Sequence, residues 1–172
     1  NILSMPDVKF KICITTDDKH VNIDGFEKCE FYISTNIGEE LKPVSKIASG
    51  GEISRIMLAI KMSLQSKDIV QTLVFDEIDS GISGAVAEKV GQAIDSLSKT
   101  HQIICITHLS QIASKGKCHF SINKNKKSNR INVEIDKLND LDRINQIAYL
   151  ISDSNITATS KKQARQLLKL NG

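Results

Sequence analysis

The hydrophobic and polar positions of this 172-residue chain change their spacing several times along the sequence. Lys9 to Thr15 and Glu30 to Thr35 alternate apolar with polar residues, which predicts two half-buried strands around an Asp24-Gly25 turn. From residue 53 the apolar residues recur at helical spacing, which predicts a helix that ends near Ser66. The residues that carry this spacing are Ile53, Met57, Ile60 and Leu64.

The middle of the chain holds two short apolar runs with a helical pattern between them. The runs are "TLVFDEI" (72–78) and "QIICITH" (102–108), and the helical pattern is "GAVAEKVGQAIDSLSK" (84–99). Strands joined by a helix of this length pair in parallel through a right-handed crossover. We therefore expect a βαβ core in which both strands are buried.

The last third of the chain predicts an antiparallel hairpin followed by two helices. His119 to Ile122 and Ile131 to Ile135 are the expected strands, and the lysine-rich segment 124–130 between them is expected to be a solvated turn. Whether this turn contacts DNA stays open. Amphipathic helices are expected at Leu141 to Ile151 and Thr157 to Leu170. The fold class is therefore α/β, with a parallel βαβ core, antiparallel strands and two C-terminal helices.

The amino-acid composition restricts the possible functions only weakly. A hydrophobic content of 40% is enough for a core, and the net charge of +3 neither demands nor excludes a nucleic-acid partner. The four cysteines form no CxxC pair, which favours reduced thiols in a cytoplasmic protein. The Cys118-His119 pair is expected to be structural, with a zinc site as the weaker alternative. No apolar run approaches the roughly 18 residues of a membrane span, and no signal peptide is visible, so no membrane partner is expected.

The segment "SGGE" (49–52) places two glycines at the start of the predicted helix. Ser49 and Glu52 have the spacing of a capping box, yet each glycine costs a helix about 1 kcal/mol relative to alanine. A helix N-terminus offers free N–H groups and a positive dipole end, and glycines let an anion such as a triphosphate come close. The alternative is an ordinary capped helix after a flexible turn.

Polar side chains follow both apolar runs of the βαβ unit. Asp76-Glu77 ends the first and Thr107-His108 ends the second, at the edge where parallel sheets bind ligands. Asp76 is suited to Mg²⁺, which prefers hard oxygen ligands, and Glu77 is suited to polarising a water molecule. A solvated strand end and an ordinary loop histidine are the simpler alternatives.

Three of these segments resemble motifs of ABC-type ATPase heads, and in particular the RecN-like relatives of the structural-maintenance-of-chromosomes (SMC) proteins. "SGGEISR" resembles the signature motif, "TLVFDEIDSGISG" the Walker B motif with the D-loop, and "ITHLSQIA" the switch-histidine loop. The resemblance implies an Mg²⁺-dependent ATPase that binds ATP. It assigns the γ-phosphate contact to Ser49, Gly50, Gly51 and Glu52, the Mg²⁺ ligand to Asp76, the catalytic base to Glu77, the D-loop to Asp79 and the switch histidine to His108.

One family motif is absent from the sequence. Nothing spells GxxxxGK[ST], because the Gly116-Lys117 pair has Gln111 and Cys118 at the other required positions. The resemblance therefore implies the C-terminal half of a head, a single partial domain over residues 1–172. Its expected parts are a coiled-coil stub (1–5), N-terminal strands (6–36), the signature helix (47–66), the Walker B to switch-histidine unit (72–109), a β-hairpin (118–136) and C-terminal helices (140–170).

The resemblance also implies partners and a cellular role. It implies recombinational repair of DNA double-strand breaks, with DNA, a second head and the N-terminal head half that carries the phosphate loop as partners, in the bacterial cytoplasm at the nucleoid. Gly50 and Gly51 are then expected to be exposed on the side of Asp76 and His108. Arg55 is expected in a surface ion pair, with nucleotide sensing as the alternative. An ABC transporter ATPase and a non-catalytic scaffold of the same fold are the competing functions.

Overall fold

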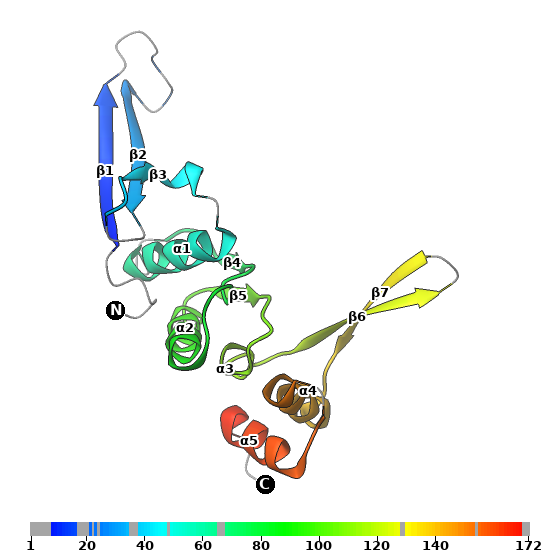
Figure 1. The fold of residues 1–172 in the computed structure, drawn as a ribbon. Helices are drawn as coiled ribbons and strands as arrows, with labels where there is room; N and C mark the ends of the chain where they lie inside the picture. The colour runs from blue at the N-terminus through cyan, green and yellow to red at the C-terminus, as the bar shows by residue number, and fades with distance from the viewer. Residues whose placement is uncertain are drawn as a thin grey trace.

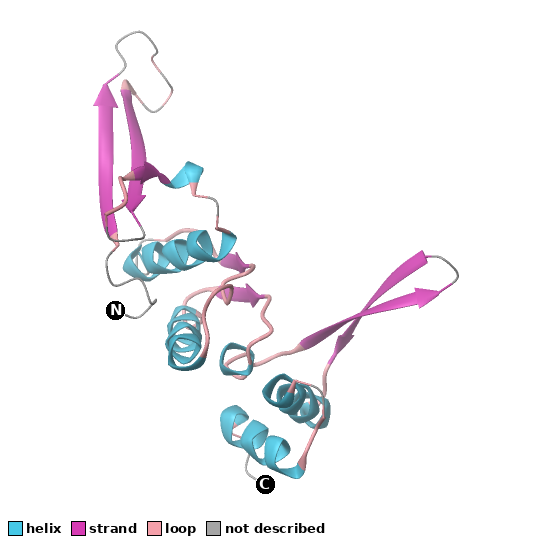
Figure 2. Cartoon of the chain, viewed as in Figure 1, coloured by secondary structure: helices cyan, strands magenta, loops and turns pink. Residues whose placement is uncertain are grey.

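A computed structural model describes residues 8–16, 21, 23, 25–34, 38–47, 49–64, 68–127, 130–153 and 155–169 of the chain, with the side chains of 125–131 left out. The expected stub at residues 1–5, Asp24 and Thr35 lie outside this part. The described residues form three small sheets and five α-helices, arranged as in Figure 1. Figure 2 shows both helices and strands along the chain, which confirms the mixed α/β class.

The first sheet is antiparallel, in the order β1 (Lys9–Thr16), β2 (Glu27–Ser34), β3 (Lys42–Pro43), followed by a 3₁₀ turn at Val44–Lys46. The alternation in the sequence places apolar residues on one face, because successive side chains of a strand point to opposite faces. On that face Phe10 pairs with Ile33, and Ile12 pairs with Phe31. Ile33 is buried, but Phe10, Ile12 and Phe31 are exposed. Most of this apolar face is therefore uncovered within the described part of the chain.

The central unit is the predicted βαβ arrangement. β4 (Thr72–Phe75) and β5 (Gln102–Cys105) pair in parallel, and α2 (Gly84–Leu97) connects them. Leu73 and Phe75 on one face of β4 pack with the buried residues of α2, among them Ala87, Val90, Ala93, Ile94 and Leu97. The opposite face is open, since Val74 is 63% and Ile104 is 49% exposed. The expectation that both strands are fully buried is therefore wrong for one face, which no described element covers.

Helix α1 (Gly50–Leu64) forms where the helical spacing predicts a helix, and its Leu58 packs into the same cluster as β4 and α2. The face of the helix that is buried, however, differs from the predicted one. Met57 and Leu64, two of the four residues that carry the spacing, are exposed. The buried residues are Gly51, Arg55, Ile56 and Leu58. The reason is that backbone carbonyl groups beyond β4 accept hydrogen bonds from the arginine, which lets a charged residue occupy the buried face.

The hairpin after β5 is longer than predicted. β6 (Phe120–Lys127) and β7 (Arg130–Lys137) pair residue by residue from Phe120 with Lys137 to Lys127 with Arg130. The expectation that 124–130 is a turn is thus wrong for most of that segment, because cross-strand hydrogen bonds satisfy its backbone whatever its side chains are. The hairpin extends away from the helices (Figure 1).

Three helices complete the fold. The short α3 (Ser110–Ala113) follows β5, and α4 (Asp140–Ser152) and α5 (Ala158–Leu168) follow the hairpin. Asn139 caps α4 through the amide of Asp142, and Thr157 caps α5 in a reciprocal box with Ser160. Both C-terminal helices are thus where the sequence predicts them. They bury a separate cluster made of Ile144, Ile147, Ala148 and Ala164.

Candidate nucleotide site

The polar residues that follow β4 and β5 lie next to each other. The register that pairs Phe75 with Cys105 brings the carboxyl ends of the two strands to one edge. At this edge lies an open pocket of about 510 Å³. Its lining brings together three residues predicted from the sequence, Glu77, Asp79 and His108, with the intervening Ser80, Gly81, Ile82 and Ser83.

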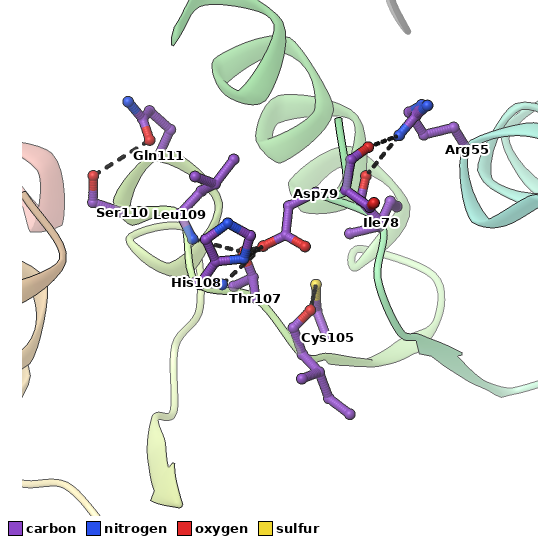
Figure 3. A network of polar contacts seen from close by, with 11 residues as sticks. Arg55, Ile78, Asp79, Cys105, Thr107, His108, Leu109, Ser110 and Gln111 are labelled. Atoms are coloured by element: carbon purple, nitrogen blue, oxygen red, sulfur yellow. Dashed lines mark hydrogen bonds and ion pairs between the residues drawn. The ribbon is translucent and has the colours of Figure 1, made fainter. Parts of the chain in front are cut away.

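The side chain of Asp79 accepts several of the polar contacts drawn at this site (Figure 3). Its side chain is 5% exposed, and its Oδ2 accepts hydrogen bonds from the hydroxyl of Thr107 at 2.6 Å and from the backbone N–H of His108 at 2.8 Å. The ring Nδ1 of His108 lies 2.9 Å from the same oxygen. The turn after β4 is thereby bonded to the loop after β5. The sequence gives no sign of this contact, because 28 residues separate Asp79 from Thr107.

Asp76 and Glu77 are both exposed. Glu77 has a φ of 55°, a left-handed conformation that is uncommon for a residue other than glycine. The N–H of Ser80 donates to the carbonyl of Glu77 at 2.9 Å, which closes a turn directly after the strand. The hydroxyl of Ser54 on α1 donates to the carbonyl of Asp76 at 2.7 Å, so the signature-like helix is bonded to the end of β4.

The two glycines at the start of α1 differ in their surroundings. Gly50 is exposed, and a Cβ atom there would lie 2.5 Å from Oε2 of Glu77. Gly51 is buried, and a Cβ atom there would lie 2.8 Å from Cβ of Ser80 and 2.9 Å from the carbonyl oxygen of Glu77. The expectation that both glycines are exposed is wrong for Gly51. Close approach of the 77–80 turn of the same chain gives this glycine a structural reason that the sequence argument missed.

The capping box at this helix is formed in one direction. The amide N–H of Glu52 donates to Oγ of Ser49 at 3.4 Å, as the spacing of the two residues predicts. Ser49 and Glu52 are both half-buried, next to the exposed Gly50. The N-terminal end of α1 is therefore capped by its own serine.

Arg55 is buried rather than in the surface ion pair expected from the sequence. Its Nη1 donates to the carbonyls of Ser80 at 2.7 Å and Ile78 at 3.4 Å, the two residues that flank Asp79 (Figure 3). Burial lowers the pKa of the guanidinium, and the charge of Glu52 opposes that shift. The position of Arg55 four residues after Gly51 and three before Leu58 was a usable signal, since these spacings share one helix face.

The cysteines form no second site in the described part of the chain. All four thiols are free, and no group of three or more His, Cys, Asp or Glu residues there could hold a metal ion. The weaker zinc alternative for Cys118-His119 thus finds no support. Burial raises the pKa of the Cys105 thiol to about 12, and the charges of Asp79 and Asp76 add to this effect. No helix among the described residues is long and apolar enough to cross a membrane.

Curated DNA repair proteins named RecN match the chain over almost its whole length. The chain is 42% identical over 168 residues to RecN of Rickettsia conorii, which covers 98% of the chain, and 39% identical over 166 residues to RecN of Vibrio cholerae, which covers 96%. A match to RecN of Bacillus subtilis has 41% identity over 145 residues. The chain spans 30% of the first two relatives and 25% of the third. No protein-family model matches the chain.

Solved structures with the same fold are heads of SMC proteins. The SMC head of Pyrococcus yayanosii with a coiled coil and joint superposes with a TM-score of 0.57 over 87% of the chain and 26% of that structure. A structure from work on ATP-driven dimerisation and DNA-stimulated activation of SMC ATPases gives a TM-score of 0.50 over 87% of the chain and 84% of that structure. Both are 19% identical to the chain, so they show the fold alone.

Proposed function

Because this chain belongs to the RecN family over the part that it spans, we propose that it is the C-terminal part of an ATPase head in a RecN-like DNA repair protein. One observation carries the proposal. Glu77, Asp79 and His108 come from the ends of two parallel strands and line one open pocket, beside the N-terminus of the signature-like helix. Nucleoside triphosphates bind at this kind of edge in α/β proteins.

In this proposal Asp76 is the ligand for Mg²⁺ and Glu77 is the catalytic base. Mg²⁺ usually takes one or two carboxylates from the protein and completes its shell with water and phosphate oxygens. The exposed carboxylate of Asp76 directly after β4 fits that requirement, since hard oxygen is the donor that this ion prefers. When bound, the ion neutralises charge on the β- and γ-phosphates. The exposed carboxylate of Glu77 lines the pocket and accepts a proton from the attacking water.

The N-terminal end of α1 is proposed to contact the nucleotide of a second head. The positive end of the helix dipole favours a phosphate, and Gly50 is exposed there. The buried Gly51 instead packs the helix against the 77–80 turn, so the proposed phosphate contact falls to the exposed Gly50 and the half-buried Ser49 and Glu52. Head dimerisation by shared nucleotide is carried over from the SMC heads as part of this proposal.

A second partner is the N-terminal half of the same head. The open face of β4 and β5 exposes Val74, Ile104 and Ile106, and the first sheet exposes Phe10, Ile12 and Phe31. Exposed apolar residues gathered on a sheet face are typical of an interface. We propose that the head half with the phosphate loop covers these faces and completes the ATP site. DNA as a ligand, repair of double-strand breaks and a place in the bacterial cytoplasm at the nucleoid are carried over from the RecN relatives.

The experiment is to compare ATP turnover by this chain and by the complete protein of the same gene. The complete protein is expected to hydrolyse ATP, and the chain alone is not, because the phosphate loop is missing from its sequence. Asp95→Asn, at an exposed position of α2, is the control that should leave turnover unchanged. A complete protein without turnover would favour the scaffold alternative. The transporter alternative is disfavoured because the matched relatives named above are DNA repair proteins.

A further inference from the structure

One oxygen of Asp79 holds both the backbone and the ring of His108. Oδ2 accepts the backbone N–H of His108 at 2.8 Å and lies 2.9 Å from Nδ1 of its ring. The hydroxyl of Thr107 donates to the same oxygen at 2.6 Å, and the N–H of Leu109 donates to that hydroxyl oxygen at 3.1 Å. The Asp79 side chain is 5% exposed, whereas the His108 side chain is 73% exposed. A buried acid thus contacts the ring of His108 (Figure 3), and this residue lines the pocket.

These contacts decide which ring nitrogen of His108 carries the proton. A backbone N–H can only donate, so Oδ2 acts as an acceptor. Nδ1 must therefore carry a hydrogen to keep its 2.9 Å contact with Oδ2. In the neutral ring Nε2 is then an acceptor, and in the protonated ring Nε2 is a second donor beside a stabilising carboxylate. In both states Nε2 is the nitrogen that remains for a ligand.

The ring contact is not needed to close the loop. The bonds from Thr107 and from the backbone of His108 already join the loop after β5 to the turn after β4. The additional contact restrains an exposed side chain, which loses rotamer freedom without burying apolar surface. A purely structural anchor would not require it, so the restraint points to a task for the ring in the pocket.

Asp79 is itself held from the other side. Arg55 on α1 donates to the carbonyls of Ile78 and Ser80, the neighbours of Asp79 in the chain. These bonds restrain the backbone on both sides of Asp79 and thereby the position of its side chain. Through the 78–80 segment, α1 is also connected to His108.

We propose that Asp79 is a positioning residue that holds His108 with Nδ1 protonated and presents Nε2 to a phosphate oxygen or a water molecule in the pocket. The identity of the ligand rests on the function proposed above. Asp79 acts through His108 here and does not itself touch the nucleotide. The geometry of the ring is independent of the reaction, so the two proposals can fail separately.

The first test is the ¹⁵N NMR spectrum of the histidine rings in this chain, at a pH at which the ring is neutral. His108→Gln assigns the signal. The parent is expected to carry its proton on Nδ1. In Asp79→Asn the acceptor is a neutral amide oxygen, which accepts hydrogen bonds more weakly than a charged carboxylate oxygen, so the ring contact weakens and both tautomers are expected. Asp68→Asn is the control, because the Asp68 side chain is also buried, 6% exposed, but contacts Lys61 and the ring of His101, so the His101 signal can change while that of His108 should not.

The second test is ATP turnover by the complete protein. Asp79→Asn is expected to lower kcat about 10- to 100-fold with KM changed less than about threefold, as for other residues that orient a reacting side chain. Asp68→Asn should leave both constants at the parental values.

A parent ring protonated on Nε2, or a folded Asp79→Asn variant with an unchanged tautomer, overturns the positioning role. If Asp79→Asn does not fold, the tautomer of the parent decides alone. Absence of ATP turnover in the parent protein contradicts the proposed function and leaves the ring result standing.

Discussion

Replacement of Gly51 by alanine tests the packing of α1 against the 77–80 turn. The new Cβ would lie 2.8 Å from Cβ of Ser80, 2.9 Å from the carbonyl oxygen of Glu77 and 3.1 Å from that of Ser80. Two of these atoms belong to the backbone, so helix or turn must move. Overpacking of this kind costs about 1–3 kcal/mol. Alanine returns up to about 1 kcal/mol in helix propensity. With that full return, the expected net loss is up to about 2 kcal/mol in the free energy of unfolding.

Gly50→Ala is the matched control, one residue earlier on the same helix. Its Cβ would meet only the carboxyl end of the Glu77 side chain, which can rotate away. We expect this variant to lie between unchanged and about 1 kcal/mol more stable, because alanine is the better helix former. Urea unfolding of the purified variants measures both. Equal stabilities of Gly50→Ala and Gly51→Ala would refute the contact between Gly51 and the turn. Ser80→Gly, which removes one clashing atom, should partly rescue Gly51→Ala.

Two further predictions concern buried polar groups. Arg55→Met should destabilise the chain by about 2–4 kcal/mol in urea unfolding, because the carbonyls of Ile78 and Ser80 lose a charged donor; a change below about 0.5 kcal/mol would contradict its burial. The pKa of the Cys105 thiol is raised from 9.0 to about 12 in the folded chain. The stability that this shift represents is complete below pH 9.0 and is lost as the pH rises toward 12, since the unfolded thiol ionises first. In Cys105→Ala the free energy of unfolding should fall less between pH 9.0 and about 12 than in the parent chain. An identical pH profile of the two proteins would contradict the raised pKa of the Cys105 thiol.

The sequence predicts the βαβ unit and both C-terminal helices because each has a clear period and clear end signals. The buried face of α1 could not be predicted in the same way. Arg55 is polar by type, and its acceptors lie 23 and 25 residues further along the chain. The burial of Gly51 depends on the same turn, so neither an anion site nor an ordinary capped helix start, the two interpretations of the glycine pair, includes this packing contact. A local pattern does not contain these contacts.

In the candidate site, too, the sequence predicts the local features and misses the long-range contacts. Asp76, Glu77 and His108 were found because acids and a histidine directly follow apolar runs, and the register of β4 with β5 brings their segments to one edge. The bond from Asp79 to Thr107 and His108 was not foreseen, because it depends on how the turn after β4 folds back. The open face of the central sheet was missed as well, since a short apolar run does not tell whether one or both faces of a strand are covered within the chain.

The comparison of Glu77→Gln with Asp76→Asn in the complete protein tests the central claim most directly. Glu77→Gln keeps size and hydrogen bonding but removes the proton acceptor, so ATP turnover should fall about 10²- to 10⁴-fold while ATP-dependent dimerisation of the heads persists. Asp76→Asn should lose turnover and dimerisation together, because it removes the proposed Mg²⁺ ligand. Turnover by Glu77→Gln at nearly the parental rate would contradict the assignment of the base, and with it the proposed ATPase site.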